Sequence, residues 1–134
     1  MRPETGDRKP ESCEPKPAFQ KRTFNFGIRC IRFIETLPKS TAAQTIAKQL
    51  LRSATSVGAN YRAAQRGRSR ADFIAKMGIV EEECDESLYW IDVLVELGLA
   101  KPNLVDPLRK EADEIIAITV SSIKTARKNA GVQK

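Results

Sequence analysis

The chain has 134 residues, of which 41% are hydrophobic and 30% are charged, and its formal net charge is +6, so we expect one globular domain. No run approaches the roughly 18 to 20 apolar residues of a membrane span, and the first residues carry charges and prolines where a signal peptide would be apolar. The three cysteines form no CxxC pair, so neither a disulfide framework nor a zinc knuckle is indicated. We therefore expect a cytoplasmic protein with free thiols and no membrane contact, whose charge permits a nucleic-acid partner without requiring one.

The first 22 residues are predicted to form a flexible tail. They contain four prolines, charges of both signs and a single aromatic residue, Phe19. Such a segment buries too little apolar surface to offset the entropy lost on ordering. The folded domain is therefore expected to span residues 23–130.

Two helices are predicted in the first part of that domain. The first runs from about residue 23 to residue 36 and stops before Leu37-Pro38, because proline disfavours helical geometry in the residue before it. The second begins near Thr41, with Ser40 or Thr41 as its N-cap, and ends around Gly67.

Two more helices follow. Ser69 is the predicted N-cap of the third, with Asp72 three residues on at the positive end of the helix dipole, and Gly98 ends it. After a turn, the fourth helix is expected from about residue 104 or 107 to residue 128. No strand-like alternation of useful length competes, so the predicted fold class is all-α.

Apolar residues at helical spacing predict a core stripe on each of the two central helices. The stripe of the second helix contains Ile46, Leu50, Val57, Tyr61 and Ala64. The stripe of the third helix contains Phe73, Met77, Val80, Cys84, Leu88, Ile91 and Val95. Four such helices would form a four-helix bundle.

Further stripes exceed what a small bundle needs. The third helix carries a second one at heptad spacing, and the first helix offers Phe26, Cys30, Phe33 and Leu37 beside Phe24, Ile28 and Ile31. Because one stripe per helix suffices, this surplus predicts self-association, with Trp90 and Phe33 as anchors, and a wider monomeric core is the alternative. The predicted oligomer interface comprises Phe26, Phe33, Ile79, Glu83, Glu86, Trp90, Val93 and Leu97.

Catalysis is disfavoured by the residues that are missing. The sequence has no histidine, so it lacks a Ser/His or Cys/His pair, a histidine metal ligand and the Glu-x-x-His pair of di-iron bundles. The clustered glutamates are spread around their helix, which is typical of a solvated or salt-bridged face. Gly58, Gly67 and Gly78 match neither a Walker loop nor a dinucleotide fingerprint. We predict a non-enzymatic protein with no catalytic residue, no metal and no cofactor.

Charge is segregated along the middle of the chain. Residues 41–70 carry six basic and no acidic residues, whereas residues 71–98 carry eight acidic residues and one lysine. The candidate nucleic-acid-binding residues are Lys48, Arg52, Arg62, Arg66, Arg68 and Arg70. Contacts from these side chains to phosphates would give salt-sensitive RNA binding.

The same arginines allow a structural interpretation. Arg52 and Arg62 could pair with carboxylates such as Glu83 and Glu86, within one chain or across subunits, and so fix orientation more than they add stability. The arginines around Gly67 should stay more available to an external anion.

Several blocks of the sequence carry a family resemblance. They are LP at 37–38, QLLRSATSVGANYRAAQRGRS at 49–69, DFIAKMGIVEEECDE at 72–86 and YWIDVLVELGL at 89–99. Together with the closing amphipathic helix, they resemble the bacterial four-helix-bundle proteins called 23S rRNA-intervening-sequence proteins. The resemblance covers roughly Phe24 to Arg127.

The resemblance implies an antiparallel up-down-up-down bundle that assembles as a homopentameric barrel. It implies little about activity, because the family name comes from where some members are encoded, inside an insertion in rRNA genes. A distant relative, the accessory protein of diversity-generating retroelements, is similar in fold and is a basic ring that binds a reverse transcriptase and RNA. By analogy, the partners expected here are further copies of the chain, and RNA or a reverse-transcriptase-like protein.

Two positions depart from the family pattern. Gly58 stands where many members have proline, and Ala63 stands where members commonly have glutamate, so no role of that carboxylate carries over.

The sequence as a whole leads to the hypothesis of a homo-oligomeric bundle that binds RNA or a ribonucleoprotein through the basic surface of the second helix. The alternative is a structural or protein-interaction module whose basic stripe forms intersubunit ion pairs and binds no nucleic acid.

Overall fold

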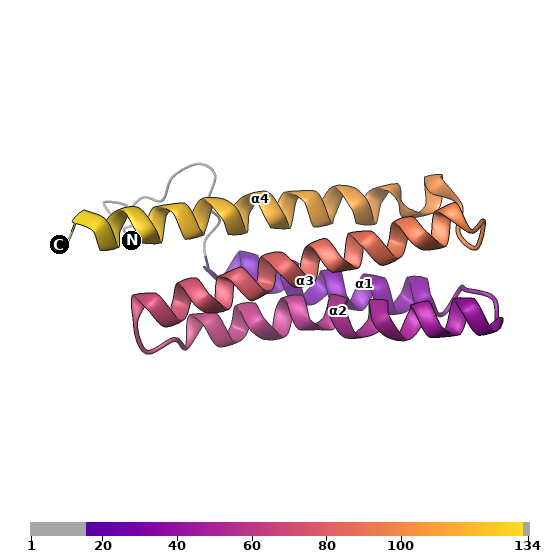
Figure 1. Ribbon diagram of the computed structural model, residues 1–134, viewed down its shortest axis with the longest axis horizontal. Coiled ribbons are helices and arrows are strands. Elements are labelled where there is room, and N and C mark those ends of the chain that lie inside the picture. The colour runs from indigo at the N-terminus through magenta and orange to yellow at the C-terminus, as the bar shows by residue number, and fades with distance from the viewer. Residues whose placement is uncertain (1–15, 133–134) are drawn as a thin grey trace.

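The computed structural model describes residues 16–132, and these form four α-helices. The helices are α1 (Lys16–Ile34), α2 (Thr41–Gln65), α3 (Arg70–Glu96) and α4 (Pro102–Val132). Consecutive helices run in opposite directions and pack side by side, and α1 and α4 share the smallest of the four contacts between helices (Figure 1). The described residues contain no strand, so the prediction of an all-α four-helix bundle is confirmed. None of these helices combines the length and the apolar character that a membrane crossing requires.

The predicted caps account for where the central helices begin and end. Ser40 Oγ accepts a hydrogen bond from the Ala43 N–H at 3.2 Å, and Ser69 Oγ accepts one from the Asp72 N–H at 3.1 Å. Gly98 follows α3 with a φ of 73°, a left-handed conformation that glycine adopts without steric cost.

The first helix starts earlier than expected, at Lys16 instead of near residue 23. Phe19 is buried in the core, and Arg22 donates from Nε and Nη2 to the carboxylate of Glu111 on α4, at 3.0 and 2.7 Å. The boundary of the predicted tail is therefore wrong for residues 16–22, which belong to the bundle. The remainder of that predicted tail, residues 1–15, lies outside the described residues.

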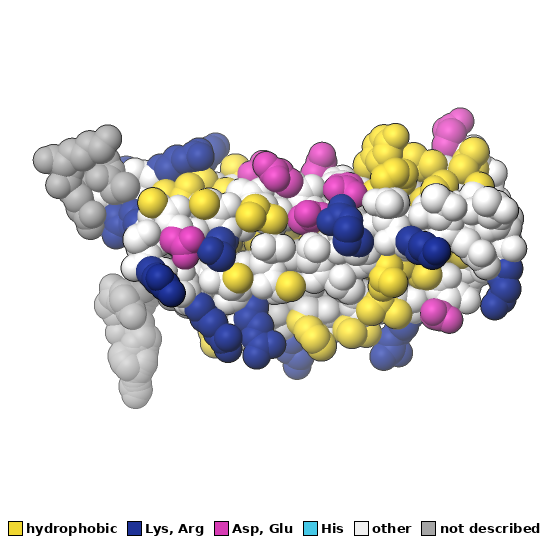
Figure 2. Space-filling model, turned by 60° about the horizontal axis from the view of Figure 1, so that its bottom comes forward, with side chains coloured by type: hydrophobic (Ala, Val, Ile, Leu, Met, Phe, Trp, Pro, Cys, Tyr) yellow, Lys and Arg dark blue, Asp and Glu magenta, His cyan; other side chains and the backbone are white. Residues whose placement is uncertain are grey.

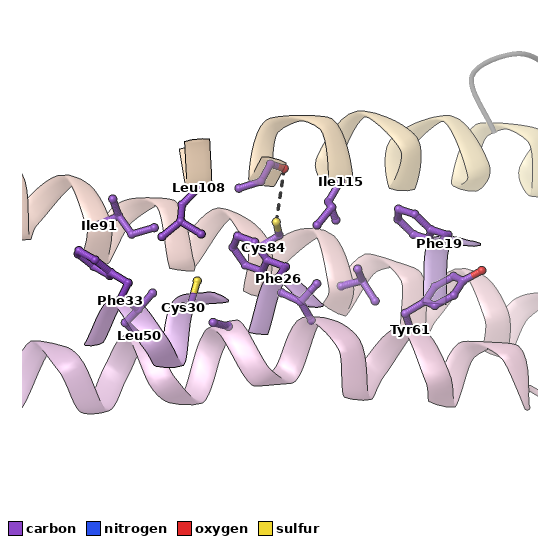
Figure 3. Close-up of a cluster of buried hydrophobic side chains, with 14 of the residues drawn as sticks. Phe19, Phe26, Cys30, Phe33, Leu50, Tyr61, Cys84, Ile91, Leu108 and Ile115 are labelled. Atoms are coloured by element: carbon purple, nitrogen blue, oxygen red, sulfur yellow. Dashed lines mark hydrogen bonds between the residues drawn. The ribbon is translucent and has the colours of Figure 1, made fainter. Parts of the chain in front are cut away.

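One continuous core runs along the inside of the bundle (Figure 3). Phe26 and Phe33 of α1 are 0% and 6% exposed there, so their assignment to an oligomer interface is wrong: both are consumed by the core of a single chain. Cys30 and Cys84 are both free and buried, and Cys84 Sγ donates to the Ala112 carbonyl at 3.5 Å. Burial raises the pKa of the Cys30 thiol to about 12, so this cysteine acts as a small apolar packing residue.

Candidate nucleic-acid interface

The outer face of α2 carries its basic residues. Lys48, Arg52, Arg62 and Arg66 are exposed, whereas Leu50, Val57, Tyr61 and Ala64 are buried. On the face shown in Figure 2, lysine and arginine side chains gather toward the end of the bundle where α2 turns into α3. The helix therefore presents a basic side to its surroundings, as the periodicity of the sequence predicts.

Arg52 is bound to carboxylates of the neighbouring helix. Its Nη1 lies 3.1 and 3.2 Å from the two carboxylate oxygens of Glu83, and its Nη2 donates to Glu86 Oε2 at 2.5 Å. The indole N–H of Trp90 donates to the same Glu86 oxygen at 2.9 Å. The hydrogen bond from Trp90 and then that from Arg52 lower the pKa of Glu86, which keeps it ionised.

We call Arg52, Glu83, Glu86 and Trp90 the Arg52 network. It confirms the predicted pairing of Arg52 with these two glutamates, within one chain. Just inside it, the buried Ser87 hydroxyl lies 2.9 Å from Ser53 Oγ of α2, so small side chains let the two helices approach closely. The close approach is what brings the Arg52 guanidinium within reach of α3.

A different environment exists at the α2–α3 turn. A depression of about 710 Å³ lies where the last turns of α2 meet the first turns of α3. It is lined by Ala59, Arg62, Ala63, Arg66, Arg68, Ser69, Asp72 and Lys76, which we call the basic depression. Within the described part of the chain, the guanidinium groups of Arg62, Arg66 and Arg68 form no ion pair. These three side chains are therefore available to an anion from outside the chain.

Asp72 is the single carboxylate of the basic depression. Its Oδ1 accepts from Lys76 Nζ at 2.8 Å, and its Oδ2 accepts from the backbone N–H of Arg68 at 3.3 Å. The bond from Lys76 and then that from the Arg68 N–H lower the pKa of Asp72, so it remains charged. Gly67 permits this tight turn, because a Cβ there would lie 3.1 Å from both the Ala64 carbonyl and Asp72 Oδ2.

The six predicted nucleic-acid-binding residues therefore separate into groups. Arg62, Arg66 and Arg68 come together in the basic depression, whereas Arg52 belongs to its own network. Lys48 lines another hollow, near the loop between α1 and α2, and the half-buried Arg70 at the start of α3 already has an interaction partner.

Lys76 is a residue of the depression that the sequence-based prediction missed. It is the one basic residue among the eight acidic residues of the stretch 71–98, and the negative net charge of that stretch hides it. Its signal was its position: it lies one turn after Asp72, in the part of α3 that an antiparallel hairpin places beside the end of α2.

The predicted interface residues other than the buried Phe26 and Phe33 lie in three environments. Ile79 and Leu97 are 38% and 54% exposed, Trp90 and Val93 are half-buried, and the two glutamates belong to the Arg52 network. Outside the predicted set, the large apolar residues exposed in the described part of the chain are Phe24, Leu51, Tyr89 and Leu104. Tyr89 packs edge-on against Trp90, with 4.9 Å between the ring centroids. On the face shown in Figure 2, a cluster of hydrophobic side chains lies toward the other end of the bundle, away from the α2–α3 turn.

Comparison with known proteins agrees with this fold. The model of the 23S rRNA-intervening sequence protein family matches residues 17–121. The chain is also similar to the crystal structure of a protein of unknown function from the S23 ribosomal protein family of Bacteroides thetaiotaomicron VPI-5482, with 30% identity and a TM-score of 0.76 over 81% of this chain and 97% of that chain. No curated protein matches. Because the match covers most of the chain, this protein belongs to the 23S rRNA-intervening sequence protein family.

Proposed function

We propose that this protein binds structured RNA, through contacts between phosphates and the basic depression, and acts by binding instead of catalysis. The observation that carries the proposal is that one hollow brings together the guanidinium groups of Arg62, Arg66 and Arg68, which form no ion pair with any residue that the structure describes. A guanidinium presents a planar fork of donors that fits phosphate oxygens, and its charge is constant at physiological pH. The helix ends hold these groups on a rigid frame, which limits the entropy lost on binding.

The proposed contact is concentrated at the turn and does not follow the whole of α2. Arg52 has its charge neutralised by two carboxylates of its own chain, so releasing it to a phosphate would cost those ion pairs. Binding that uses only a few phosphates has a moderate dependence on salt, because each contact releases about one counterion.

We further propose that the chain assembles with copies of itself, in the five-membered ring that the family resemblance implies. The large apolar side chains of Ile79 and Tyr89 on α3, and of Leu97 at its C-cap, are exposed, and an interface between copies would bury them. A ring would repeat the basic depression in every subunit. Several weak phosphate sites on one particle then bind a large RNA more tightly than any single site does.

The second candidate is a protein-interaction module that binds no nucleic acid, with a reverse-transcriptase-like protein as one possible partner class. The exposed aromatic side chains of Phe24 and Tyr89 favour it. Its original form, in which arginines pair with glutamates of another subunit, has less support for Arg52, because Glu83 and Glu86 already bind that arginine within the chain.

RNA binding across a salt series tests the proposal. The RNAs would be a large-subunit rRNA fragment and an unrelated structured RNA, and affinity should fall as salt rises. The double variant Arg66→Glu/Arg68→Glu should weaken binding by more than about tenfold at 0.1 M salt. The matched control is Lys39→Glu/Lys101→Glu, which changes net charge equally at exposed loop positions of the opposite end of the bundle. Absence of binding at low salt, or equal losses in both double variants, would contradict the proposed site.

A further inference from the structure

The free positive charge on the α2–α3 side of the bundle is concentrated at one point. Arg62, Arg66 and Lys76 reach the same hollow from two helices, and Arg68 joins them from the turn. Ten residues before Arg62 on α2, roughly 15 Å along the helix axis, the next arginine belongs to the Arg52 network. An RNA strand that ran from the hollow along α2 would next reach Arg52, whose charge is already neutralised by Glu83 and Glu86. The arrangement therefore favours a ligand whose negative charge is also concentrated.

The lining is organised to leave donors available. Lys76 uses one of its three N–H groups on Asp72, so two remain for a ligand. Ser69 Oγ already accepts the Asp72 N–H, so the side-chain cations, and not the end of α3, supply the attraction for an anion. Four cationic side chains face one carboxylate, which leaves an excess of positive charge in the hollow.

A phosphomonoester fits these properties better than an internal phosphodiester. It carries about −1.5 to −2 charge at pH 7 and three strong acceptor oxygens, so several guanidinium groups can bind it at once. An internal phosphate of an RNA strand carries a single charge and has two free oxygens. Resting on the RNA binding proposed above, we propose that the basic depression binds a phosphomonoester at an RNA end, in preference to phosphates within the strand.

The alanines of the wall make room for such a group. Ala59 and Ala63 of α2 line the depression with single methyl groups. A glutamate at position 63 would place a carboxylate three residues from Arg66 on the same helix, where the two side chains can pair. The variant Ala63→Glu should therefore fill the hollow with an internal anion, while Ala63→Gln adds nearly the same volume without charge. Both residues are good helix formers, so the bundle should fold in each.

The test compares one RNA hairpin in three forms: with hydroxyl groups at both ends, with a 5′-phosphate and with a 3′-phosphate. We expect at least one phosphorylated form to bind about tenfold more tightly than the hydroxyl form, as added charge-assisted hydrogen bonds would produce. The preference should persist in Ala63→Gln and disappear in Ala63→Glu. Free adenosine monophosphate should compete only at far higher concentration than the phosphorylated hairpin, because the assignment is to an RNA end.

Acidity gives a second measure of the same preference. The second ionisation of a phosphomonoester lies near pH 6, and the chain has no histidine to titrate in that range. The preference for the phosphorylated hairpin should therefore shrink between pH 7.5 and pH 5.5, while binding of the hydroxyl form changes little.

The outcomes separate the two proposals. Equal binding of all three hairpins, with a loss in Arg66→Glu/Arg68→Glu, would overturn the preference for RNA ends and leave RNA binding standing. A preference that survives in Ala63→Glu would place the end-binding site elsewhere. Competition by adenosine monophosphate at the same concentration as the hairpin would make the ligand a small phosphomonoester instead of an RNA end. Absence of binding by every form would overturn both proposals.

Discussion

Arginines on one face of α2 lie in two different electrostatic environments, one acidic and one basic. Arg52, near the middle of α2, is held by Glu83 and Glu86, whereas Arg62 and Arg66, near the turn, share a hollow with Lys76. The residue type and the helix are the same in both stretches. The difference therefore comes from the neighbouring helix, α3.

The antiparallel register explains the difference. Each step along α2 toward the turn meets an earlier residue of α3, and Ser53 lies against Ser87. Residues near Arg62 consequently lie against the first turns of α3, where Lys76 stands and no glutamate occurs before Glu81. The acidic run of α3 neutralises the middle of α2 and leaves its end basic. Which arginines of α2 remain available to a ligand therefore depends on the residues of α3 that pack beside them.

The largest effect should follow from separating the two helices beneath the Arg52 network. Ser87→Leu adds volume between α2 and α3 and removes the hydroxyl that Ser53 contacts, so we expect a loss of about 2 to 4 kcal/mol in the free energy of unfolding. Urea denaturation measures it, with Ser87→Ala as the milder control. A loss below that of Ser87→Ala would show that the close approach of the helices is not needed.

Removing the carboxylates should turn the neutral stretch of α2 into a basic one. In Glu83→Gln/Glu86→Gln, Arg52 is released, so RNA affinity at 0.1 M salt should rise by about five- to tenfold, as one more phosphate contact would produce. The matched control, Glu81→Gln/Glu82→Gln, changes net charge equally in the groove between α3 and α4. Equal gains in both variants would mean that net charge alone, and not the release of Arg52, governs binding.

Loss of the Arg52 side-chain charge should have a small effect on stability. The guanidinium is half-exposed, so Arg52→Gln should lower the free energy of unfolding by less than about 1 kcal/mol, and it should leave RNA affinity nearly unchanged. Thermal unfolding and RNA titration of the same samples measure both. A large fall in RNA affinity would contradict the division between the two stretches.

The smallest effect concerns Asp72 and depends on pH. Because its pKa is lowered in the folded protein, Asp72 stabilises the fold above the ordinary pKa of about 3.9, and this contribution is lost as pH falls through the lowered value. The difference in stability between the wild type and Asp72→Asn should therefore be constant at neutral pH and vanish in acid below pH 4. A difference that grows in acid would contradict the assigned bonds from Lys76 and Arg68.

Much of this organisation could be predicted from the sequence. The four helices, the caps at Ser40 and Ser69, and the stop at Gly98 depend on local backbone chemistry, which short segments encode. The pairing of Arg52 with Glu83 and Glu86 could also be predicted, because a tight turn between two helices makes them neighbours.

Three features of the structure could not be predicted from the sequence, and each has a physical reason. The predicted boundary at residue 23 depends on the composition of the whole segment 1–22, which contains four prolines and only one aromatic residue. That one aromatic residue, Phe19, is nevertheless buried, and the hydroxyl of the buried Thr23 donates to its carbonyl at 3.1 Å, one helical turn away. Helix α1 has large apolar residues on several faces, and periodicity alone could not tell the buried Phe26 from the exposed Phe24. The role of Lys76 depends on the register between helices, which single-helix patterns do not contain.

The central claim is that Arg62 and Arg66 contact RNA phosphates whereas Arg52 does not. Its most direct test is the salt dependence of RNA binding in variants that each neutralise one of these arginines. We would measure the slope of log affinity against log salt for the wild type, Arg52→Gln, Arg62→Gln and Arg66→Gln. Each lost phosphate contact lowers the slope by roughly 0.7 to 0.9, so we expect that reduction for Arg62→Gln and Arg66→Gln, and an unchanged slope for Arg52→Gln. A reduced slope for Arg52→Gln together with unchanged slopes for the other two would contradict the account.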